Sequence, residues 1–275
     1  MKKHIITIFL ILLLVTGLGL LLYPSFSDWW NSFHQSRAID AYSRTVEQLD
    51  AKVWDEVYAA ARDYNASLPE RPNNFLLTPQ QQIQYRQLLN LEGNGLMGYL
   101  EIPVIDVLLP IYHGADEGVL QVAVGHLEWT SLPVGGESSH CVLSGHRGLP
   151  SARLFTDLDA VEVGDTFSLH VLGQTLTYQV DQILVVEPQE TEALLIQPGQ
   201  DLCTLVTCTP YGINSHRMLV RGSRIEPEAA APLAVVSAEA MPVSLGARVT
   251  PVLVLWLLWL CIPRRRKGGR RDERK

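Results

Sequence analysis

The distribution of apolar residues begins with one long uninterrupted run. The segment IITIFLILLLVTGLGLLLY, from Ile5 to Tyr23, contains no charged residue and follows Lys2 and Lys3. It is long enough to cross the hydrocarbon of a membrane as a helix. A cleaved signal peptide has a similar basic start and apolar run, but no A-x-A-like small-residue site follows here, which favours an uncleaved anchor.

Two helices are predicted after this run. From Ser36 to Tyr64 apolar residues recur at every third or fourth position. This spacing predicts an amphipathic helix that packs on the main domain; a partner-binding coiled coil is the alternative. The closely spaced Pro69, Pro72 and Pro79 predict a connecting loop. A second helix is expected from Pro79 to about Asn90, before the turn EGNG.

From Leu96 onward the pattern changes to short, alternating, β-branched runs separated by Gly and Pro. Seven of these runs are predicted strands: GYLEIPVI, VLLPIY, HCVLSG, DTFSLHVL, TLTYQVDQILVVE, DLCTLVTC and RMLVRGSRIE. Short helical segments are expected at EGVLQVAVG and SARLFTDLDAV. Many short strands with frequent turn signals predict a β-barrel or a sandwich.

The C-terminal part has a tether and a second apolar stretch. Residues 226–247 are low in charge and rich in Ala, Pro and Ser, which is typical of a tether. The stretch VTPVLVLWLLWLCIP then extends from Val249 to Pro263 and precedes RRRKGGRRDERK. We expect it to cross the membrane; the alternative is a tail in the interface with its tryptophans at headgroup depth. Basic residues on the far side of both apolar stretches place both termini in the cytoplasm and the residues between them outside the cell.

The charge balance agrees with this partition. The last twelve residues hold eight Lys or Arg and two Asp or Glu, and Lys2 and Lys3 add two positive charges. Without these ten basic and two acidic residues, the totals of 22 and 29 fall to 12 and 27, a net charge of −15. An acidic body is a poor nucleic-acid binder, whereas basic tips suit anionic lipid.

Three side chains at predicted strand ends form a candidate catalytic set: His146 in LSGHRG, Cys208 in TLVTC and Arg217 in SHRMLV. A cysteine nucleophile needs a nearby imidazole or cation to hold its thiolate. His146 supplies this and can pass a proton to a leaving amine. Arg217 offers donors to the charge that builds on a carbonyl oxygen. Taken singly, each residue is more typical of a turn, a core or a solvated surface.

The sequences around these residues resemble the sortase family of Gram-positive cysteine transpeptidases. TLVTC is followed nine residues later by Arg217 and preceded about sixty residues earlier by SGHRG. The resemblance extends over roughly residues 98–224 and includes GYLEIP, LPIYHG, GHLEWTSLPVGG and TCTPYG. These blocks are most similar to class C sortases, which polymerise pilins. Two membrane segments around an external domain are also similar to that class.

The resemblance implies a mainly β fold, a closed eight-stranded barrel with short helices, preceded by a helical region and flanked by membrane segments. It implies Cys208 as nucleophile, His146 as general acid or base, and Arg217 as the group that positions substrate and stabilises the oxyanion. We expect Ser144, Thr207 and Thr209 to bind substrate. The expected organisation is an anchor (1–23), a helical region (36–90) with a lid-like loop (68–79), a catalytic barrel (96–226), a linker (227–247), a second membrane segment (249–263) and a basic tail (264–275).

The implied reaction is cleavage of an LPXTG-like sorting signal between Thr and Gly through a thioacyl-enzyme on Cys208. A lysine amine of another pilin then resolves the intermediate as an isopeptide bond. The implied partners are pilin or surface-protein substrates and membrane lipid. No metal or organic cofactor is needed, because the bond that is broken supplies the energy for the bond that is made.

One segment departs from the class C pattern. These enzymes usually cover the site with a lid that bears Asp-Pro-aromatic, whereas this chain has Arg71-Pro72, with Phe75 as the only aromatic residue nearby. We therefore expect the loop 68–79 to shield the cleft through Phe75 and to be held more loosely. Unchanged peptide cleavage and unchanged thiol labelling of Cys208 after deletion of the loop would contradict this expectation.

The remaining cysteines and histidines are expected to be structural. Cys141 and Cys203 each lie five residues before a candidate catalytic residue, so they face each other if their strands are neighbours, either as thiols or as a disulfide. The histidines match no compact metal-ligand spacing and are expected in structural or surface positions: His113, His126, His140, His170 and His216.

Two other functions are considered. Within the same enzyme class, a sortase can attach surface proteins to the cell wall with a peptidoglycan amine in place of a pilin lysine. A different class is a non-catalytic surface scaffold for pilus assembly. The presence of His146, Cys208 and Arg217 together argues against a scaffold, which has no use for the three groups. The long N-terminal helical region and the second apolar stretch favour pilus assembly.

Overall fold

The computed structural model describes residues 2–69 and 76–226. The lid residues Arg71, Pro72 and Phe75, the linker, the second apolar stretch and the basic tail lie outside the described residues. The helices are α1 (Lys2–Glu47), α2 (Ala51–Ser67), α3 (Pro79–Gln87) and α4 (Glu117–Leu120), with 3₁₀ turns η1 (Pro103–Ile105), η2 (Leu158–Ala160) and η3 (Glu192–Leu194). The strands are β1 (Leu96–Ile102), β2 (Val107–His113), β3 (Val124–His126), β4 (Ser139–Ser144), β5 (Thr166–Val171), β6 (Gln174–Val186), β7 (Asp201–Thr209) and β8 (His216–Arg224).

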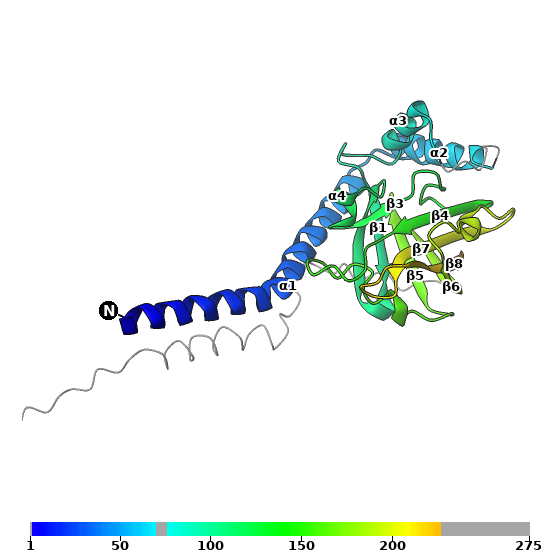
Figure 1. Cartoon of the computed structure of the whole chain (residues 1–275). Coiled ribbons are helices and arrows are strands. Elements are labelled where there is room, and N and C mark those ends of the chain that lie inside the picture. Colours follow the sequence, from blue (N-terminus) through cyan, green and yellow to red (C-terminus); the bar gives the residue numbers. More distant parts are fainter. Residues whose placement is uncertain (1, 70–75, 227–275) are drawn as a thin grey trace, which may run out of the picture. The chain divides into compact units, whose positions relative to one another are not determined.

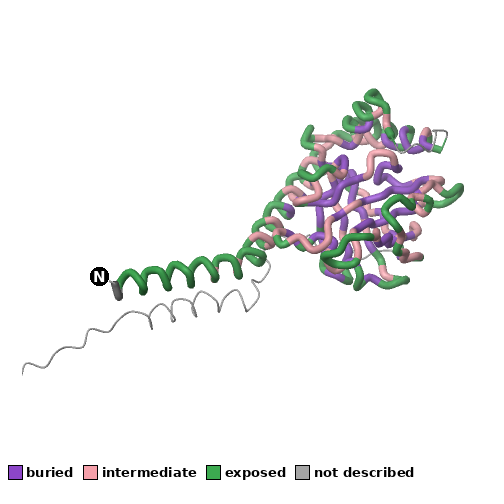
Figure 2. Tube along the Cα trace, in the orientation of Figure 1, coloured by how far each residue is buried: buried purple, intermediate pink, exposed green. Residues whose placement is uncertain are grey.

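Within residues 76–226, eight strands close a barrel in the order β1-β2-β3-β4-β7-β8-β6-β5 (Figure 1). The predicted closed eight-stranded barrel is confirmed. The pair β4 and β7 is parallel, and both strands are buried along almost their whole length (Figure 2). Strands covered on both faces need apolar residues at consecutive positions, which explains the unbroken runs CVL in β4 and LV in β7.

Strand β3 is the one that the sequence pattern did not predict. It lies in EGVLQVAVG, of which the first four residues form helix α4 as expected and the last two begin the strand. Three residues are too few to show alternation. Gly125 is required in this strand because a Cβ there would stand 2.2 Å from the carbonyl oxygen of Gly114.

The predicted long amphipathic helix is two helices. α1 ends at Glu47 and α2 begins at Ala51, because Asp50 caps α2 by accepting a hydrogen bond from the amide of Lys52. The prediction that this region packs on the main domain is correct. On α1, the Tyr42 hydroxyl donates to the carbonyl of Met97 at 2.9 Å and accepts from the amide of Leu172 at 2.8 Å.

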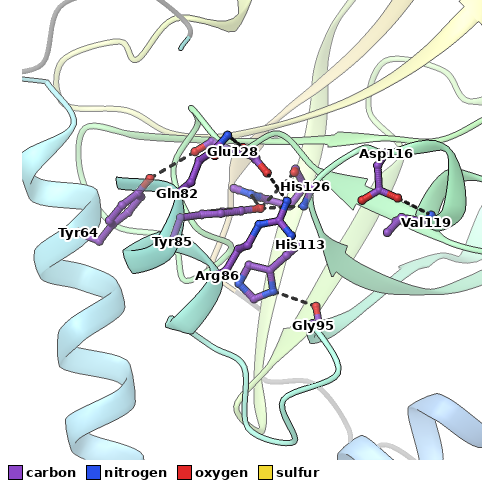
Figure 3. A network of polar contacts seen from close by, with 11 residues as sticks. Tyr64, Gln82, Tyr85, Arg86, Gly95, His113, Asp116, Val119, His126 and Glu128 are labelled. Carbon is purple, nitrogen blue, oxygen red and sulfur yellow. Dashed lines mark hydrogen bonds and ion pairs between the residues drawn. The ribbon is translucent and has the colours of Figure 1, made fainter. Parts of the chain in front are cut away.

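Helix α3 is fixed to the barrel by a buried tyrosine. It begins with the capping box of Thr78 and Gln81, and its Tyr85 is fully buried. The Tyr85 hydroxyl lies 2.9 Å from Nδ1 of His126 (Figure 3). It also accepts a hydrogen bond from the amide of Gly114 at 3.0 Å. Burial raises the pKa of Tyr85 well above its ordinary value, so the phenol stays neutral.

Replacing Tyr85 with Phe is expected to lower the free energy of unfolding by about 1–3 kcal/mol, because it leaves the buried Gly114 amide without its acceptor. Chemical denaturation of the full chain in detergent measures this loss. Tyr58→Phe is the control, since Tyr58 is only half-buried and stacks on Trp54. Equal stability of the wild type and Tyr85→Phe would show that the hydroxyl contributes nothing.

A buried histidine on β4 makes stability depend on pH. Nδ1 of His140 lies 2.9 Å from the carbonyl of Leu195, and Nε2 lies 2.7 Å from the Thr204 hydroxyl. A neutral imidazole satisfies both contacts, donating to the carbonyl and accepting from the hydroxyl. Desolvation by burial lowers the pKa of His140 below its ordinary 6.5, and the charge of Arg221 acts in the same direction.

The unfolded chain therefore binds a proton at His140 at a higher pH than the folded chain does. The stability that neutral His140 contributes to the folded state is fully present above about pH 6.5. It falls as the pH drops from there toward the lowered pKa of His140. We expect the free energy of unfolding to fall more steeply below about pH 6.5 in the wild type than in His140→Gln. Denaturation curves across this range decide the point, and parallel profiles for the two proteins would contradict it.

Candidate active site

The hairpin of β7 and β8 brings Cys208 and Arg217 together. The two strands are antiparallel, and Cys208 and Arg217 are directly opposite in the register. Directly opposite residues of an antiparallel pair project from the same face of the sheet, so the two side chains are neighbours. Both residues are half-buried. Nη1 of Arg217 donates to the carbonyls of Asn214 at 3.2 Å and His216 at 3.0 Å, which holds the guanidinium against the turn.

His146 reaches the same rim by a different route. It follows β4, whose last residue Ser144 is the register partner of Val206 in the parallel strand β7. Beyond that pair, the amide of Gly145 donates to the carbonyl of Val206 at 3.0 Å, and the Thr207 hydroxyl donates to the carbonyl of Gly145 at 2.8 Å. The segment that carries His146 is thus attached to β7 immediately before Cys208.

The three expected substrate-binding residues have different positions. Ser144 and Thr209 are half-buried at the ends of their strands, Ser144 two residues before His146 and Thr209 directly after Cys208. Thr207 is buried, and strand alternation directs it to the face opposite Cys208. Its hydroxyl donates a hydrogen bond to the carbonyl of Gly145, so Thr207 holds the segment that carries His146 and does not face the site.

Two residues that sequence reasoning did not single out connect the segments on either side of the site. Arg147 is nearly buried, with 9% of its side chain exposed, and pairs with Asp159. Its guanidinium carbon lies 6.0 Å from the ring centre of Tyr211, which belongs to the turn after Cys208. A Cβ at Gly148 would stand 2.8 Å from the same ring. The available signal was the position of both residues within SGHRG and TCTPYG.

The other two cysteines among the described residues belong to the core. Cys141 and Cys203 are register partners in β4 and β7, both are buried, and both are free thiols. The interpretation that they face each other in the barrel agrees with this register. Burial raises the pKa of the Cys203 thiol well above its ordinary value, which keeps it protonated.

The five histidines that were expected in structural or surface positions have hydrogen-bond partners within the chain. The imidazoles of His113, His126, His140 and His170 are buried and hydrogen-bonded, and His216 contacts the hydroxyl of Ser215. In the part of the chain that the structure describes, no group of three or more His, Cys, Asp or Glu side chains is arranged to hold a metal ion.

A cavity of about 220 Å³ lies apart from the candidate catalytic residues. Its lining comes from the described end of the lid-like loop, from α3 and from the segment after β3, and includes Leu76, Leu77, Gln82, Leu127 and Trp129. Cys208, His146 and Arg217 are not among its lining residues. The strand register, and not this cavity, therefore brings the candidate catalytic residues together.

A cysteine, an imidazole and a guanidinium at one rim of a β-barrel are the groups that a cysteine acyltransferase requires. A family model described as the sortase domain matches residues 100–225. Sortase D of Bacillus subtilis (strain 168) is 31% identical over 137 residues, which cover 49% of this chain and 66% of that protein.

Solved structures are more similar. Sortase C1 from Streptococcus agalactiae is 47% identical with a TM-score of 0.68, and the match covers 69% of this chain and 98% of that chain. Sortase C from Streptococcus pneumoniae is 45% identical with a TM-score of 0.62, and the match covers 71% of this chain and 100% of that one. The chain belongs to the sortase family of cysteine transpeptidases, and it is most like class C sortases.

Proposed function

We propose that this protein is a membrane-anchored class C sortase that polymerises pilins. The observation that carries the proposal is the pairing of Cys208 with Arg217 across β7 and β8, with the His146 segment bonded to the same strand. The similarity to class C sortases over nearly their whole length supports it. The structure of the Streptococcus pneumoniae relative is described in terms of catalysis and pilin substrate specificity.

The first half of the reaction is acylation of the enzyme. The Cys208 thiolate attacks the carbonyl carbon of Thr in an LPXTG-like sorting signal, and a tetrahedral intermediate forms. Arg217 donates hydrogen bonds to its oxyanion, where charge develops. Protonated His146 gives its proton to the departing Gly amine as the C–N bond breaks. The products are a Cys208 thioester and a free amine on the C-terminal fragment.

The second half transfers the acyl group to a lysine. The ε-amine of a second pilin attacks the thioester carbonyl, and neutral His146 accepts the proton that this amine loses. Collapse of the second tetrahedral intermediate breaks the C–S bond and returns Cys208 as a thiolate. One isopeptide bond replaces one peptide bond, so the chemistry needs no external energy source.

Membrane anchoring is supported by the first part of α1. One described helix is long and apolar enough to cross a membrane, with a mean hydropathy of 3.0 over its most apolar window and none of that window buried. We propose that it holds the barrel at the external face of the cell membrane. We also propose that the second apolar stretch crosses the membrane, so that both termini are cytoplasmic.

The choice of acceptor amine tests the proposal. The full chain in detergent is incubated with an LPXTG-containing donor and either a lysine-bearing pilin or a peptidoglycan stem-peptide amine, and the products are identified by mass spectrometry. An isopeptide bond to the pilin lysine is expected. Transfer only to the peptidoglycan amine would make the enzyme a cell-wall-attaching sortase. Absence of any acyl-enzyme on Cys208 would support a scaffold.

A further inference from the structure

Four exposed aromatic residues follow the apolar stretch on α1. Phe26, Trp29, Trp30 and Phe33 are 60%, 54%, 50% and 48% exposed. Their spacing of three and four residues places them on one face of the helix. Their rings contact each other, with Phe26 and Trp30 at 6.3 Å and Trp29 and Phe33 at 6.3 Å between centroids. We call these four residues the aromatic face.

The opposite face of the same helical segment is bound to the barrel domain. Oδ1 of Asp28 accepts from the amide of Arg153 at 2.8 Å, and Nδ2 of Asn31 donates to the carbonyl of Ser151 at 2.8 Å. Nε2 of Gln35 donates to the carbonyl of Val122 at 2.7 Å. We call Asp28, Asn31 and Gln35 the docked face. Successive residues of a helix are rotated by about 100°, so the mean direction of the docked face is roughly 180° from that of the aromatic face.

This arrangement leaves the aromatic face turned away from the protein. In a soluble helix the exposed side is polar, because an apolar stripe is stable only where something covers it. Here the docked side carries Asp28, Asn31 and Gln35, and the outward side carries the aromatic rings. The polarity of the two sides is thus the reverse of that expected for a helix whose outer side meets water.

The position of the aromatic face identifies what covers it. Residues 5–23 rise about 28 Å as a helix, close to the roughly 30 Å thickness of membrane hydrocarbon. Along the helix axis Phe26 lies about 5 Å beyond Tyr23, and Phe33 about 15 Å beyond it. The headgroup layer on each side is about 5–8 Å deep, and tryptophan is enriched there because its ring is both apolar and a hydrogen-bond donor. Pro24 lies inside α1 between the apolar stretch and the aromatic face, and a proline inside a helix bends it. An oblique course after Pro24 keeps all four rings within the headgroup layer.

We propose that Phe26, Trp29, Trp30 and Phe33 bind the headgroup layer of the outer leaflet. This inference rests on the proposed membrane anchoring by residues 5–23 and adds a second contact with a separate role. The same helical segment bonds to the chain that follows His146, since Ser151 and Arg153 lie in that connection. The lipid contact therefore fixes the depth of α1 and, through Asp28 and Asn31, the distance of the active site from the membrane surface.

The test measures the depth of Trp29 and Trp30 in vesicles. The full chain carrying Trp256→Phe and Trp259→Phe, which removes the tryptophans of the second apolar stretch, is reconstituted into phosphatidylcholine vesicles with bromine at a shallow acyl position. Bromine quenches tryptophan only at close range. We expect strong quenching, which Trp29→Phe with Trp30→Phe reduces by more than about half, whereas the matched control Trp54→Phe does not. Trp54 lies on α2 and donates its indole N–H to the carbonyl of Leu172 in the barrel domain.

Failure of the inference is distinct from failure of the anchor. Flotation with the vesicles reports anchoring, so a chain that floats with unquenched Trp29 and Trp30 overturns the inference and leaves the anchor in place. A chain that does not float overturns both. A photoreactive benzoylphenylalanine at position 30 identifies the occupant: a lipid adduct supports the inference. An adduct with residues 249–263 or with a second copy of the chain overturns it.

Discussion

Cys208→Ala is expected to abolish acyl transfer, lowering kcat/KM by at least about 10⁴-fold, because no other group at the rim can form the thioester. The expected result includes complete loss of the acyl-enzyme in intact-protein mass spectra. The folded state should be unaffected, since Cys208 is only half-buried and lies near the end of its strand. A circular dichroism spectrum like that of the wild type verifies this.

Cys203→Ala is the matched control on the same strand. Its thiol lies in the barrel core and is kept protonated by burial, so it cannot replace the nucleophile. We expect the folded fraction of Cys203→Ala to retain wild-type activity per molecule, with some loss of stability. If Cys208→Ala still formed pilin polymers in cells, the proposed chemistry would be wrong and the scaffold function would be favoured.

Arg217→Ala is expected to lower kcat by about 10²–10³-fold, because the charge on the tetrahedral intermediate loses its fixed donor. Thiol labelling of Cys208 should persist, since the nucleophile remains in place. Arg217→Lys should recover only part of the rate, because an ammonium keeps the charge but loses the planar fork of donors. Steady-state kinetics with an LPXTG peptide separate the two variants.

Arg221→Ala serves as the control for Arg217. Arg221 lies four residues further along β8, is half-buried, and binds Asp181 through Nε at 2.9 Å and Nη2 at 3.1 Å. It lies opposite Thr204 and away from Cys208 in the register. A rate loss in Arg221→Ala as large as in Arg217→Ala would mean that the effect comes from the strand and not from the site.

Seven of the eight barrel strands were predictable because each of the seven contains enough residues to show its pattern. β6 is a long run of 13 residues and β8 one of nine, whereas β3 has only three residues and follows a helical turn, so no periodicity marks it. The break between α1 and α2 was missed because the apolar spacing continues across it. Only the cap at Asp50 records the end of one helix and the start of the next.

The parts of the candidate site also differed in how far the sequence alone predicted their positions. The closeness of Cys208 and Arg217 follows from a short turn between two strands, which the sequence displays directly. The closeness of His146 depends on the parallel pairing of β4 with β7, which no local pattern specifies. Its place at a predicted strand end made it a candidate, and the resemblance to sortases implied that it joins Cys208 and Arg217. Arg147 and Tyr211 were missed because their contact joins two connections that are far apart in the sequence.

The parallel pairing of β4 with β7 also means that the parts of the site differ in the length of chain that must be closed to bring them together. Cys208 and Arg217 are brought together by a local hairpin, which requires closure of only a short loop. His146 joins them through closure of a loop of about sixty residues, which costs more chain entropy. Local opening of the β4 end would release the imidazole while the cysteine and guanidinium stay paired. His146, the proposed acid–base group, is therefore the member of the candidate site whose position depends most on the folded barrel.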